Sequence, residues 1–234
     1  MLKGKTAIVT GSTSGIGLGI ATALAAEGCD VMLNGFGDPA AIETLRAGLA
    51  ERHGVRVAYH PADMAKPAEI RDLVGETARR FGTVDILVNN AGIQHVAKLV
   101  DFPEERWDAV IAVNLSAAFH ATKAALPLMI ARRWGRVINI ASAHGLVASG
   151  EKAAYVTAKH GLVGLTKVAA IETANQGVTC NAICPGWVLT PLVEQQIAAR
   201  ARAQGIPVEQ AREDLVREKQ PMLEIGRASC RERV

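Results

Sequence analysis

Aromatic side chains are scarce in this sequence, and most of its hydrophobic residues are aliphatic. Aromatics make up 4% of the 234 residues, whereas 49% are hydrophobic. Ala, Val, Leu and Gly dominate, which is typical of alternating α/β folds. A chain of this length and composition suits one sizeable globular domain with an aliphatic core.

Cysteines are also few, and they show no metal-ligand pattern. Cys29, Cys180 and Cys184 lie in or beside apolar runs of strand length, and Cys230 lies near the end of the sequence. Cys180 and Cys184 have no partner pair elsewhere, so no zinc site is expected. We expect the cysteines to be reduced, small core residues of a cytoplasmic protein.

The sequence carries little excess charge and no long apolar run. Its formal net charge is +3, of which residues 225–234 contribute +2 through three arginines and one glutamate, leaving +1 for residues 1–224. This balance predicts neither a nucleic-acid nor a membrane partner. No apolar run is expected to span a membrane, and the apolar stretch within residues 1–10 is too short for a signal peptide.

Strand-like and helix-like patterns alternate along most of the chain, without an internal repeat or a low-complexity linker. This alternation predicts one α/β domain, a doubly wound parallel sheet with helices on both faces. The last two helices are expected to be a mobile pair over a site. The predicted strands are Lys5–Thr10, Cys29–Asn34, Val55–His60, Val84–Val88, Val137–Ile140 and Val178–Cys184; the predicted helices run to about Glu27 and over Pro39–His53, Pro67–Phe81, Pro103–Arg133, Ala153–Gly177 and Pro191–Gln220, the last broken at Gly205 and Pro207.

A glycine-rich turn follows the first predicted strand. Gly11, Gly15 and Gly17 allow a tight turn and let a ligand approach the backbone closely. The next helix offers free N–H groups and its positive dipole end to a phosphate. A plain tight turn would show similar glycines, but the strand before and the helix after favour a dinucleotide site.

The end of the second predicted strand indicates which nicotinamide cofactor is used. An acidic residue there would hold the adenosine ribose, and a basic one would hold a 2′-phosphate. The segment 34–37 (Asn-Gly-Phe-Gly) has neither, and no Arg or Lys lies within residues 11–17 or 34–38. A 2′-phosphate would lack a cationic partner, so NAD is expected. Phe36 lies against the adenosine or forms a hydrophobic plug.

The best candidates for chemistry are Ser142, Tyr155 and Lys159. Tyr155 and Lys159 are four residues apart on one predicted helical face, and the preceding turn brings Ser142 towards them. A phenol with a reference pKa of about 10 becomes a useful base when nearby positive charge favours the phenolate. Such a trio suits conversion of an alcohol to a ketone. A half-buried aromatic beside a solvated cation would show the same spacing.

Polar residues also follow other predicted strands. Asp63 and the segment 89–92 (Asn-Asn-Ala-Gly) fall at the carboxyl edge of the sheet, where ligands bind in such folds. Asp63 could equally cap a helix or form a turn. Asn114 lies inside a predicted helix among apolar neighbours, which implies a bend, a bound water or a site.

These residues, taken together in this order, resemble the short-chain dehydrogenase/reductase family from about Lys5 to Gln220. The resemblance implies that Tyr155 is the general acid/base and that Ser142 orients the substrate oxygen. It implies that Lys159 lowers the pKa of Tyr155 and binds the nicotinamide ribose, while Asn114 holds a water in the proton relay. It also implies a seven-stranded parallel sheet, usually in a homotetramer. The implied cofactor-binding residues are Gly11, Thr13, Ser14, Gly15, Ile16, Gly17, Phe36, Asp63, Met64, Asn90, Ala91, Gly92, Val113, Tyr155, Lys159, Pro185, Gly186, Val188 and Thr190.

Several local strings are similar to those of the bacterial D-3-hydroxybutyrate dehydrogenases, among them residues 92–95, 142–145, 151–155 and 186–193. This resemblance implies NAD-dependent interconversion of (R)-3-hydroxybutyrate and acetoacetate. A small hydroxy-acid anion needs a cation and several hydrogen-bond donors near the catalytic tyrosine. Lys152 as a solvated turn lysine and His144 as a turn cap remain the alternatives. The implied substrate-binding residues are Gln94, Ser142, His144, Lys152, Tyr155, Trp187 and Gln196.

The C-terminal residues depart from the family pattern. Family members continue with a helix, a seventh strand and a Val-Asp-Gly-Gly-like ending, whereas residues 224–234 resemble a translated sequencing adapter. We therefore expect residues 1–223 to be a dehydrogenase domain without its final strand and residues 224–234 to be a non-native tail. An open sheet edge and uncovered apolar surface would follow.

Three other functions remain open. An NADPH-dependent 3-oxoacyl carrier-protein reductase is disfavoured by the absence of basic residues at the cofactor loop and by Lys152, His144 and Gln196. A non-catalytic nucleotide-binding protein is disfavoured by the intact Ser142, Tyr155 and Lys159. An inactive fragment is supported only by the C-terminal departure.

Overall fold

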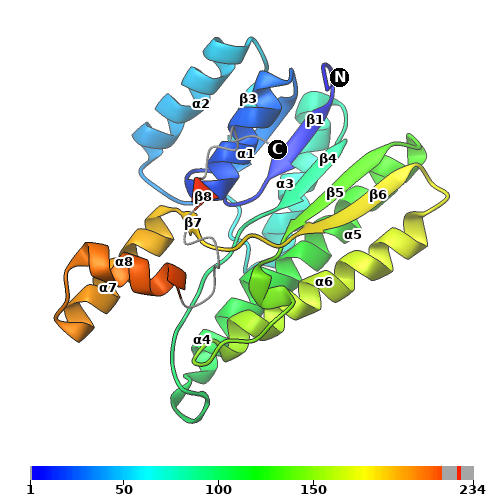
Figure 1. Cartoon of the computed structure of the whole chain (residues 1–234). Coiled ribbons are helices and arrows are strands. Elements are labelled where there is room, and N and C mark those ends of the chain that lie inside the picture. The colour runs from blue at the N-terminus through cyan, green and yellow to red at the C-terminus, as the bar shows by residue number, and fades with distance from the viewer. Residues whose placement is uncertain (1, 218–225, 228–234) are drawn as a thin grey trace.

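The computed structural model describes residues 2–217 and 226–227 and contains a six-stranded parallel sheet. The strand order is β3-β2-β1-β4-β5-β6, with successive strands separated by helices (Figure 1). The predicted fold class is therefore confirmed. The strands are β1 Thr6–Val9, β2 Asp30–Asn34, β3 Val57–His60, β4 Ile86–Asn89, β5 Gly135–Ile140 and β6 Val178–Ile183.

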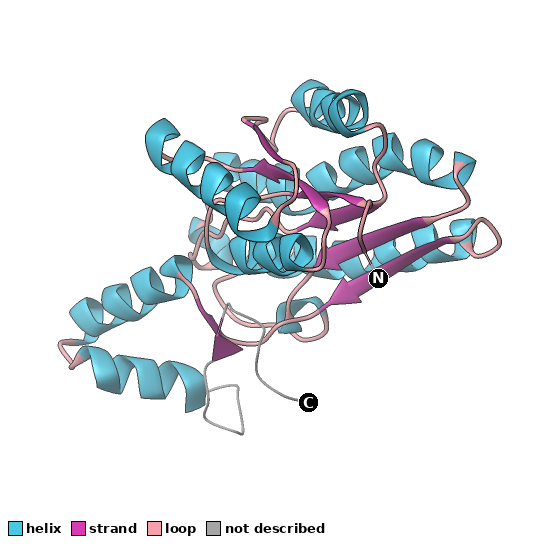
Figure 2. Ribbon diagram, turned by 90° about the horizontal axis from the view of Figure 1, so that it is seen from above, coloured by secondary structure: helices cyan, strands magenta, loops and turns pink. Residues whose placement is uncertain are grey.

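Helices lie on both faces of this sheet (Figure 2). Successive side chains of a strand point to opposite faces, and here each face has its own core. Ile8 packs in a cluster with residues of α3 and α5, whereas Val9 packs with residues of α1 and α2. Burial on both faces explains the continuous apolar runs of the strands. These helices are α1 Gly15–Ala26, α2 Pro39–His53, α3 Pro67–Phe81, α4 Glu104–Ile111, α5 Ala117–Ala131 and α6 Ala153–Thr173.

Helix ends follow local capping chemistry where the sequence supplies it. Helix α2 begins at Pro39, Asp38 accepts a hydrogen bond from the Ala41 amide at 2.8 Å, and Gly54 ends the helix at φ +64°. The predicted bounds of α2 and α3 are confirmed. By contrast, β4 begins at Ile86 rather than at Val84, and α6 ends at Thr173, before the predicted Gly177.

The long helical stretch 104–131 is interrupted in its middle. A π-helical turn, η2 (Ala112–Ser116), separates α4 from α5 and contains the buried Asn114. By length and composition alone this stretch could cross a membrane, with a mean hydropathy of 1.3. Ala121 and Met129 of α5 are fully buried against the sheet, as in the core helix of a globular domain.

The chain then leaves the sheet and forms a separate helical hairpin (Figure 1). Strand β7 (Val188–Leu189) leads to α7 (Pro191–Gln204) and α8 (Val208–Arg217). The helices pack on each other through their own apolar cluster, and the predicted break at Gly205 and Pro207 lies between them. The predicted positions 218–220 lie outside the described residues, while β8 (Gly226–Arg227) pairs with β7.

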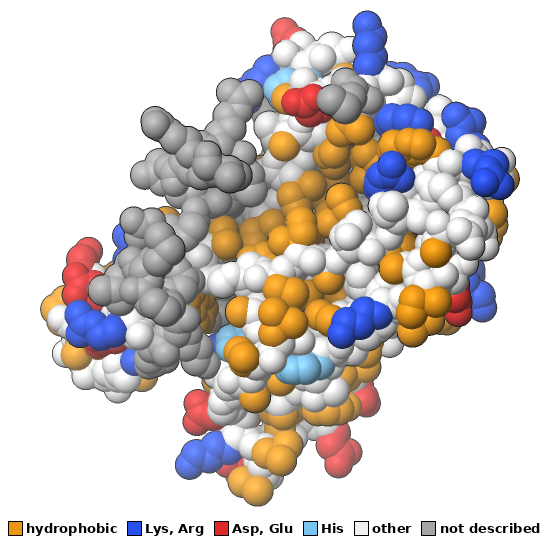
Figure 3. Space-filling view, turned by 45° about the vertical axis from the view of Figure 1, so that its right-hand side comes forward, with side chains coloured by type: hydrophobic (Ala, Val, Ile, Leu, Met, Phe, Trp, Pro, Cys, Tyr) orange, Lys and Arg blue, Asp and Glu red, His pale blue; other side chains and the backbone are white. Residues whose placement is uncertain are grey.

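Strand β6 is an edge of the described sheet. Thr179, Asn181 and Ile183 of this strand are exposed, and the side chain of Ile183 is 50% exposed. Figure 3 shows hydrophobic side chains gathered along one face of the molecule. The sequence predicts an open edge with apolar surface when no further strand pairs with β6, and among the described residues none does.

Candidate active site

One cavity of about 710 Å³ lies at the carboxyl ends of the strands. Its walls come from the segments that follow β1, β2, β3, β4, β5 and β6, and from α6 and α7. This is the edge at which parallel α/β sheets bind ligands. The cavity is large enough to hold a cofactor and a small substrate together.

The glycine turn after β1 forms a cradle at one end of this cavity. Gly11 and Gly15 adopt φ values of +62° and +56°, which other residues rarely adopt. Thr13, Ser14 and Ile16 complete this wall, at the N-terminus of α1. The positive end of the α1 dipole and its free N–H groups suit a pyrophosphate.

Gly17 is not part of the cavity wall, although the sequence predicts it as a cofactor residue. A Cβ atom at Gly17 would lie 2.2 Å from the carbonyl oxygen of Gly11 and 2.4 Å from the Asn90 side-chain nitrogen. Asn90 donates hydrogen bonds to the carbonyls of Thr10 (2.9 Å) and Gly11 (3.0 Å). Gly17 therefore lets α1 and Asn90 approach the turn and keeps the cradle in shape.

The wall beyond the glycine turn contains Phe36, Asp63 and Met64, all predicted as cofactor residues. Phe36 is 69% exposed, so it is not a plug in the core. Its carbonyl accepts a hydrogen bond from Thr13 Oγ1 at 2.9 Å, and the carbonyl of Gly35 accepts one from Tyr59 at 2.7 Å. The first bond holds the end of β2 against the glycine turn, and the second holds it to β3.

The structure brings Ser142, Tyr155 and Lys159 together at the other end of the cavity. Ser142 begins the short helix η3 (Ala143–Gly145), and Tyr155 and Lys159 lie on α6. Burial raises the pKa of the Tyr155 phenol, and a hydrogen bond with Ser142 lowers it. Positive charge from Lys159 thus has to overcome the effect of burial before Tyr155 becomes a base.

Lys159 is almost completely buried, with 4% of the residue exposed. Its Nζ donates a hydrogen bond to the carbonyl of Ile140 at 2.7 Å and lies 5.6 Å from the centre of the Tyr155 ring. Burial lowers the pKa of Lys159 to about 8. A buried, hydrogen-bonded cation next to a phenol is difficult to explain by packing alone.

Asn114 is 2% exposed and lies beside the main cavity rather than in its wall. Its side chain accepts a hydrogen bond from the Ile93 amide at 2.8 Å and donates one to the Ile93 carbonyl at 2.9 Å. The predicted disturbance at Asn114 is therefore a π turn tied to the segment after β4. A second cavity of about 10 Å³ adjoins Asn114 and the buried Asn89.

Five further predicted residues converge on the wall that Tyr155 shares. The Gln196 side chain donates a hydrogen bond to Gln94 at 3.2 Å, so α7 contacts the segment after β4. The Lys152 ammonium group lies 5.2 Å from the ring centre of Trp187. The His144 and Tyr155 rings are 6.2 Å apart. Amide, imidazole and ammonium groups near one phenol form a site suited to a small anion.

The remaining predicted residues Asn90, Ala91, Gly92, Val113, Pro185, Gly186, Val188 and Thr190 also line the cavity. Several residues that line the cavity are not predicted from the sequence. Most of them are apolar or glycine, so they carry no functional group that would mark them as site residues. Asn34 is the exception, because a polar residue at the carboxyl end of a buried strand is a detectable signal. The unpredicted lining residues include Asn34, Gly35, Ile93, Ile140, Ala141, Val147, Ala148 and Val193.

The sequence predicts no zinc site and reduced cysteines, and the placement of metal-ligand groups and cysteine thiols bears on both predictions. Within the described residues no group of three or more His, Cys, Asp or Glu is placed to hold a metal ion. Cys29 and Cys180 are free and buried, and burial raises the pKa of both thiols. Cys184 is free but only partly buried, and Cys230 lies outside the described residues.

The family model for short chain dehydrogenases matches residues 5–201. The chain belongs to this family, and it is an oxidoreductase by class. A D-beta-hydroxybutyrate dehydrogenase of Cupriavidus necator is 65% identical over 223 residues, which cover 94% of this chain and 85% of the relative. One of Rhizobium meliloti is 57% identical over 217 residues, which cover 93% of this chain and 84% of that protein.

Two solved structures have the same fold. NAD+-bound xylitol dehydrogenase matches with a TM-score of 0.88 and 30% identity, over 97% of this chain and 89% of its own. An actinorhodin polyketide ketoreductase with NADPH matches with a TM-score of 0.89 and 35% identity, over 96% of this chain and 86% of its own. These two proteins bind different nicotinamide dinucleotides, so the fold alone does not select between them.

Proposed function

We propose that this protein interconverts (R)-3-hydroxybutyrate and acetoacetate with NAD. The observation that carries the proposal is the convergence of Gln94, His144, Lys152 and Gln196 on the cavity wall beside Tyr155. A carboxylate there would meet a cation and several hydrogen-bond donors within reach of the acid/base residue. The names of the two bacterial relatives support the same substrate.

In the proposed oxidation, the substrate carboxylate is held by the Lys152 side of the pocket, and Ser142 orients the C3 hydroxyl. The Lys159 charge stabilises the Tyr155 phenolate, which accepts the hydroxyl proton and becomes a neutral phenol. When bound, NAD+ supplies the acceptor for the hydride that leaves C3. The glycine cradle fits the cofactor, because a Cβ at Gly17 would displace the turn that offers N–H groups to the pyrophosphate.

We assign NAD rather than NADP from the end of β2. The exposed Phe36 lies where a residue pairing with a 2′-phosphate would be needed. No Arg or Lys occurs within residues 11–17 or 34–38, so this phosphate would lack a charged partner. A homotetramer in the cytoplasm belongs to the same proposal.

The experiment follows the formation of NADH from NAD+ and of NADPH from NADP+, each with (R)-3-hydroxybutyrate, the (S) enantiomer and a 3-hydroxyacyl thioester. We expect turnover with the (R) acid and NAD+, and Tyr155→Phe should lose nearly all turnover but still bind NADH. Preference for the thioester with NADP+ would instead support a 3-oxoacyl carrier-protein reductase. NADH binding without any turnover would support a non-catalytic nucleotide-binding protein.

Apolar side chains on α5 and α6 support assembly. Phe119, Val168 and Ile171 are 46%, 52% and 77% exposed, although such residues are usually buried. Light scattering after gel filtration should give four copies per particle. Ile171→Glu should reduce that number, whereas the exposed Glu172→Gln on the same helix should not. A parent protein that stays monomeric would contradict the tetramer.

A further inference from the structure

The segment after β3 forms part of the cavity wall without regular secondary structure to hold it. Ala62, Asp63 and Met64 contribute to the wall. They lie next to the end of β2, where this fold holds the adenosine half of a dinucleotide. Because the segment between β3 and α3 is neither helix nor strand, its position depends on side-chain hydrogen bonds.

Asn34 holds the carbonyl groups of this segment. Its fully buried amide nitrogen donates to the carbonyls of His60 (3.2 Å) and Ala62 (2.9 Å), and its oxygen accepts from the Gly11 amide at 3.3 Å. One amide therefore ties the segment to the glycine turn. These bonds leave the N–H group of Ala62 to be held by another residue.

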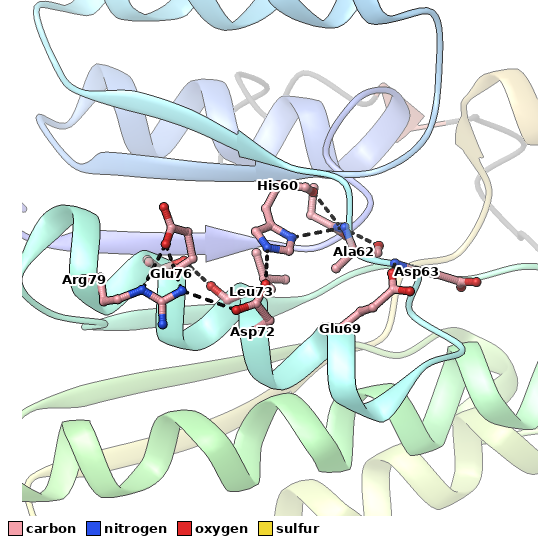
Figure 4. A network of polar contacts seen from close by, with 10 residues as sticks. His60, Ala62, Asp63, Glu69, Asp72, Leu73, Glu76 and Arg79 are labelled. Atoms are coloured by element: carbon pink, nitrogen blue, oxygen red, sulfur yellow. Dashed lines mark hydrogen bonds and ion pairs between the residues drawn. The ribbon is translucent and has the colours of Figure 1, made fainter.

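His60 supplies that second attachment, as Figure 4 shows. The Ala62 N–H donates to His60 Nδ1 at 3.2 Å, so Nδ1 must be unprotonated, and the ring proton lies on Nε2. Nε2 is 3.2 Å from Asp72 Oδ2 on α3, a carboxylate that accepts this proton in a hydrogen bond. The arrangement fits one tautomer of neutral histidine.

Asp72 is in turn held by α3. Arg79 donates to Asp72 Oδ1 at 3.3 Å and to Glu76 Oε2 at 2.9 Å (Figure 4). The hydrogen bond from His60 is the largest cause that lowers the pKa of Asp72, and the bond from Arg79 adds to it. Asp72 is exposed, whereas the His60 side chain is only 15% exposed. His60 therefore links a charged surface residue to Ala62 in the cavity wall.

We propose that His60, oriented by Asp72, is a positioning residue that holds Ala62, and with it the start of the segment after β3, in place for the adenosine half of the cofactor. This inference rests on the proposed cofactor site but not on the substrate. In the sheet order, β3 is separated from β5 by three strands, and the catalytic Ser142 follows β5. His60 should therefore affect cofactor affinity and leave the chemical step unchanged.

The test measures NADH affinity by fluorescence, together with kcat and KM for NAD+ in the full chain. His60→Leu removes both ring bonds and should weaken NADH binding about 5-fold, a loss expected for one or two hydrogen bonds, with kcat at saturating NAD+ unchanged. His60→Asn should bind NADH within about 2-fold of the parent, because an asparagine oxygen can accept from the N–H two residues on.

Asp72→Ala is a surface change on α3 that leaves the core intact and should weaken binding in the same direction, by less. Glu76→Ala is its matched control, since Glu76 also pairs with Arg79 but does not touch His60. Equal NADH affinity in the parent and His60→Leu would overturn the proposal. A fall in the kcat of His60→Leu as large as its fall in NADH affinity would also overturn it. Because NADH binding needs no substrate, failure to oxidise 3-hydroxybutyrate would refute the proposed function and leave this test intact.

Discussion

Lys159 is a buried cation whose only hydrogen-bond acceptor among the described residues is the Ile140 carbonyl. Its pKa in the folded protein is about 8, below the value of 10.5 for a solvated lysine. The folded state thus releases its proton at a lower pH than the unfolded state does. Between these values the unfolded state binds more protons, so stability rises with pH; below pH 8 the full cost of the buried charge is present.

Lys159→Met should therefore raise stability at pH 7 while removing activity. The shift corresponds to about 3 kcal/mol at 1.36 kcal/mol per pKa unit, and the unpaired Ile140 carbonyl would offset part of it, so we expect a gain of about 1–2 kcal/mol. The gain should shrink as pH rises from 8 towards 10. Urea unfolding at pH 7, 8 and 9.5 measures it, and a variant less stable than the parent at pH 7 would contradict the argument.

The positive charge of Lys152 should favour an anionic substrate over an uncharged one. Lys152→Ala should raise KM for (R)-3-hydroxybutyrate about 10- to 100-fold, the size of a lost charge-assisted hydrogen bond, and change KM for an uncharged secondary alcohol little. The matched control is Lys167→Ala, which changes an exposed lysine on α6, the helix that begins just after Lys152. Steady-state kinetics with both substrates measures the two KM values. An equal rise in KM for both substrates would contradict the assignment of Lys152 to the substrate carboxylate.

At the residue scale, the sequence could predict the chemical side chains but not their electrostatics. The spacing of Tyr155 and Lys159 follows from helix geometry, and the structure brings them to one cavity with Ser142. The low pKa of Lys159 depends on burial by β5 and on packing across the fold, which no local pattern encodes. The ring bonds of His60 escaped prediction because Asp72 lies 12 residues away on another element.

At the scale of elements, Gly17 is required by a close approach and not by its backbone conformation. Gly17→Ala would place a methyl group 2.2 Å from the Gly11 carbonyl oxygen. We expect a loss of about 1–3 kcal/mol in unfolding free energy, as for overpacked sites, together with weaker NADH binding. Gly48→Ala in α2 meets nothing within 4 Å and should gain up to about 1 kcal/mol from helix propensity.

Thermal unfolding and NADH titration of these two variants provide the measurement. If Gly17→Ala kept both the stability and the affinity of the parent, the close packing of α1 on the glycine turn would be refuted. If Gly48→Ala also lost stability, the loss in Gly17→Ala could not be assigned to its contact with the glycine turn, because an added methyl group would destabilise a helix even without a close contact.

The sequence predicted the elements best where caps or strict periodicity mark them. Proline at the start and glycine after the end gave the bounds of α2 and α3. Asn114 signalled a disturbance, but the π turn depends on a pair of hydrogen bonds with Ile93, 21 residues away. Long-range partners of this kind cannot be found from local propensity.

At the scale of the whole molecule, the sheet and the α7–α8 hairpin are held by separate cores. The hairpin core consists of Val193, Ile197, Ala201, Ala211 and Leu215, with Trp187 and Ile206 packed against it. The sequence predicted two helices here, but their placement follows from contacts such as that between Gln196 and Gln94. A unit with its own small core should open at lower free energy than the sheet does.

Amide hydrogen exchange should therefore be faster in α7 and α8 than in β1 or β4. Adding NADH with (R)-3-hydroxybutyrate forms a ternary complex without turnover, because both ligands are reduced. That complex should slow exchange in α7, since a substrate anion would meet Gln94 and Gln196 together and hold the hairpin over the site. Helix α2, whose residues lie away from the cavity, should not respond.

Gln196→Ala separates this closure from general stabilisation by the ligands. In that variant the protection of α7 should fall, while protection around the glycine turn on NADH binding stays the same. Gln204→Ala, at the far end of α7, is the matched control. If α7 exchanged at the same rate with and without the two ligands, the hairpin would be a fixed wall of the site, and substrate access would have to occur elsewhere along the cavity.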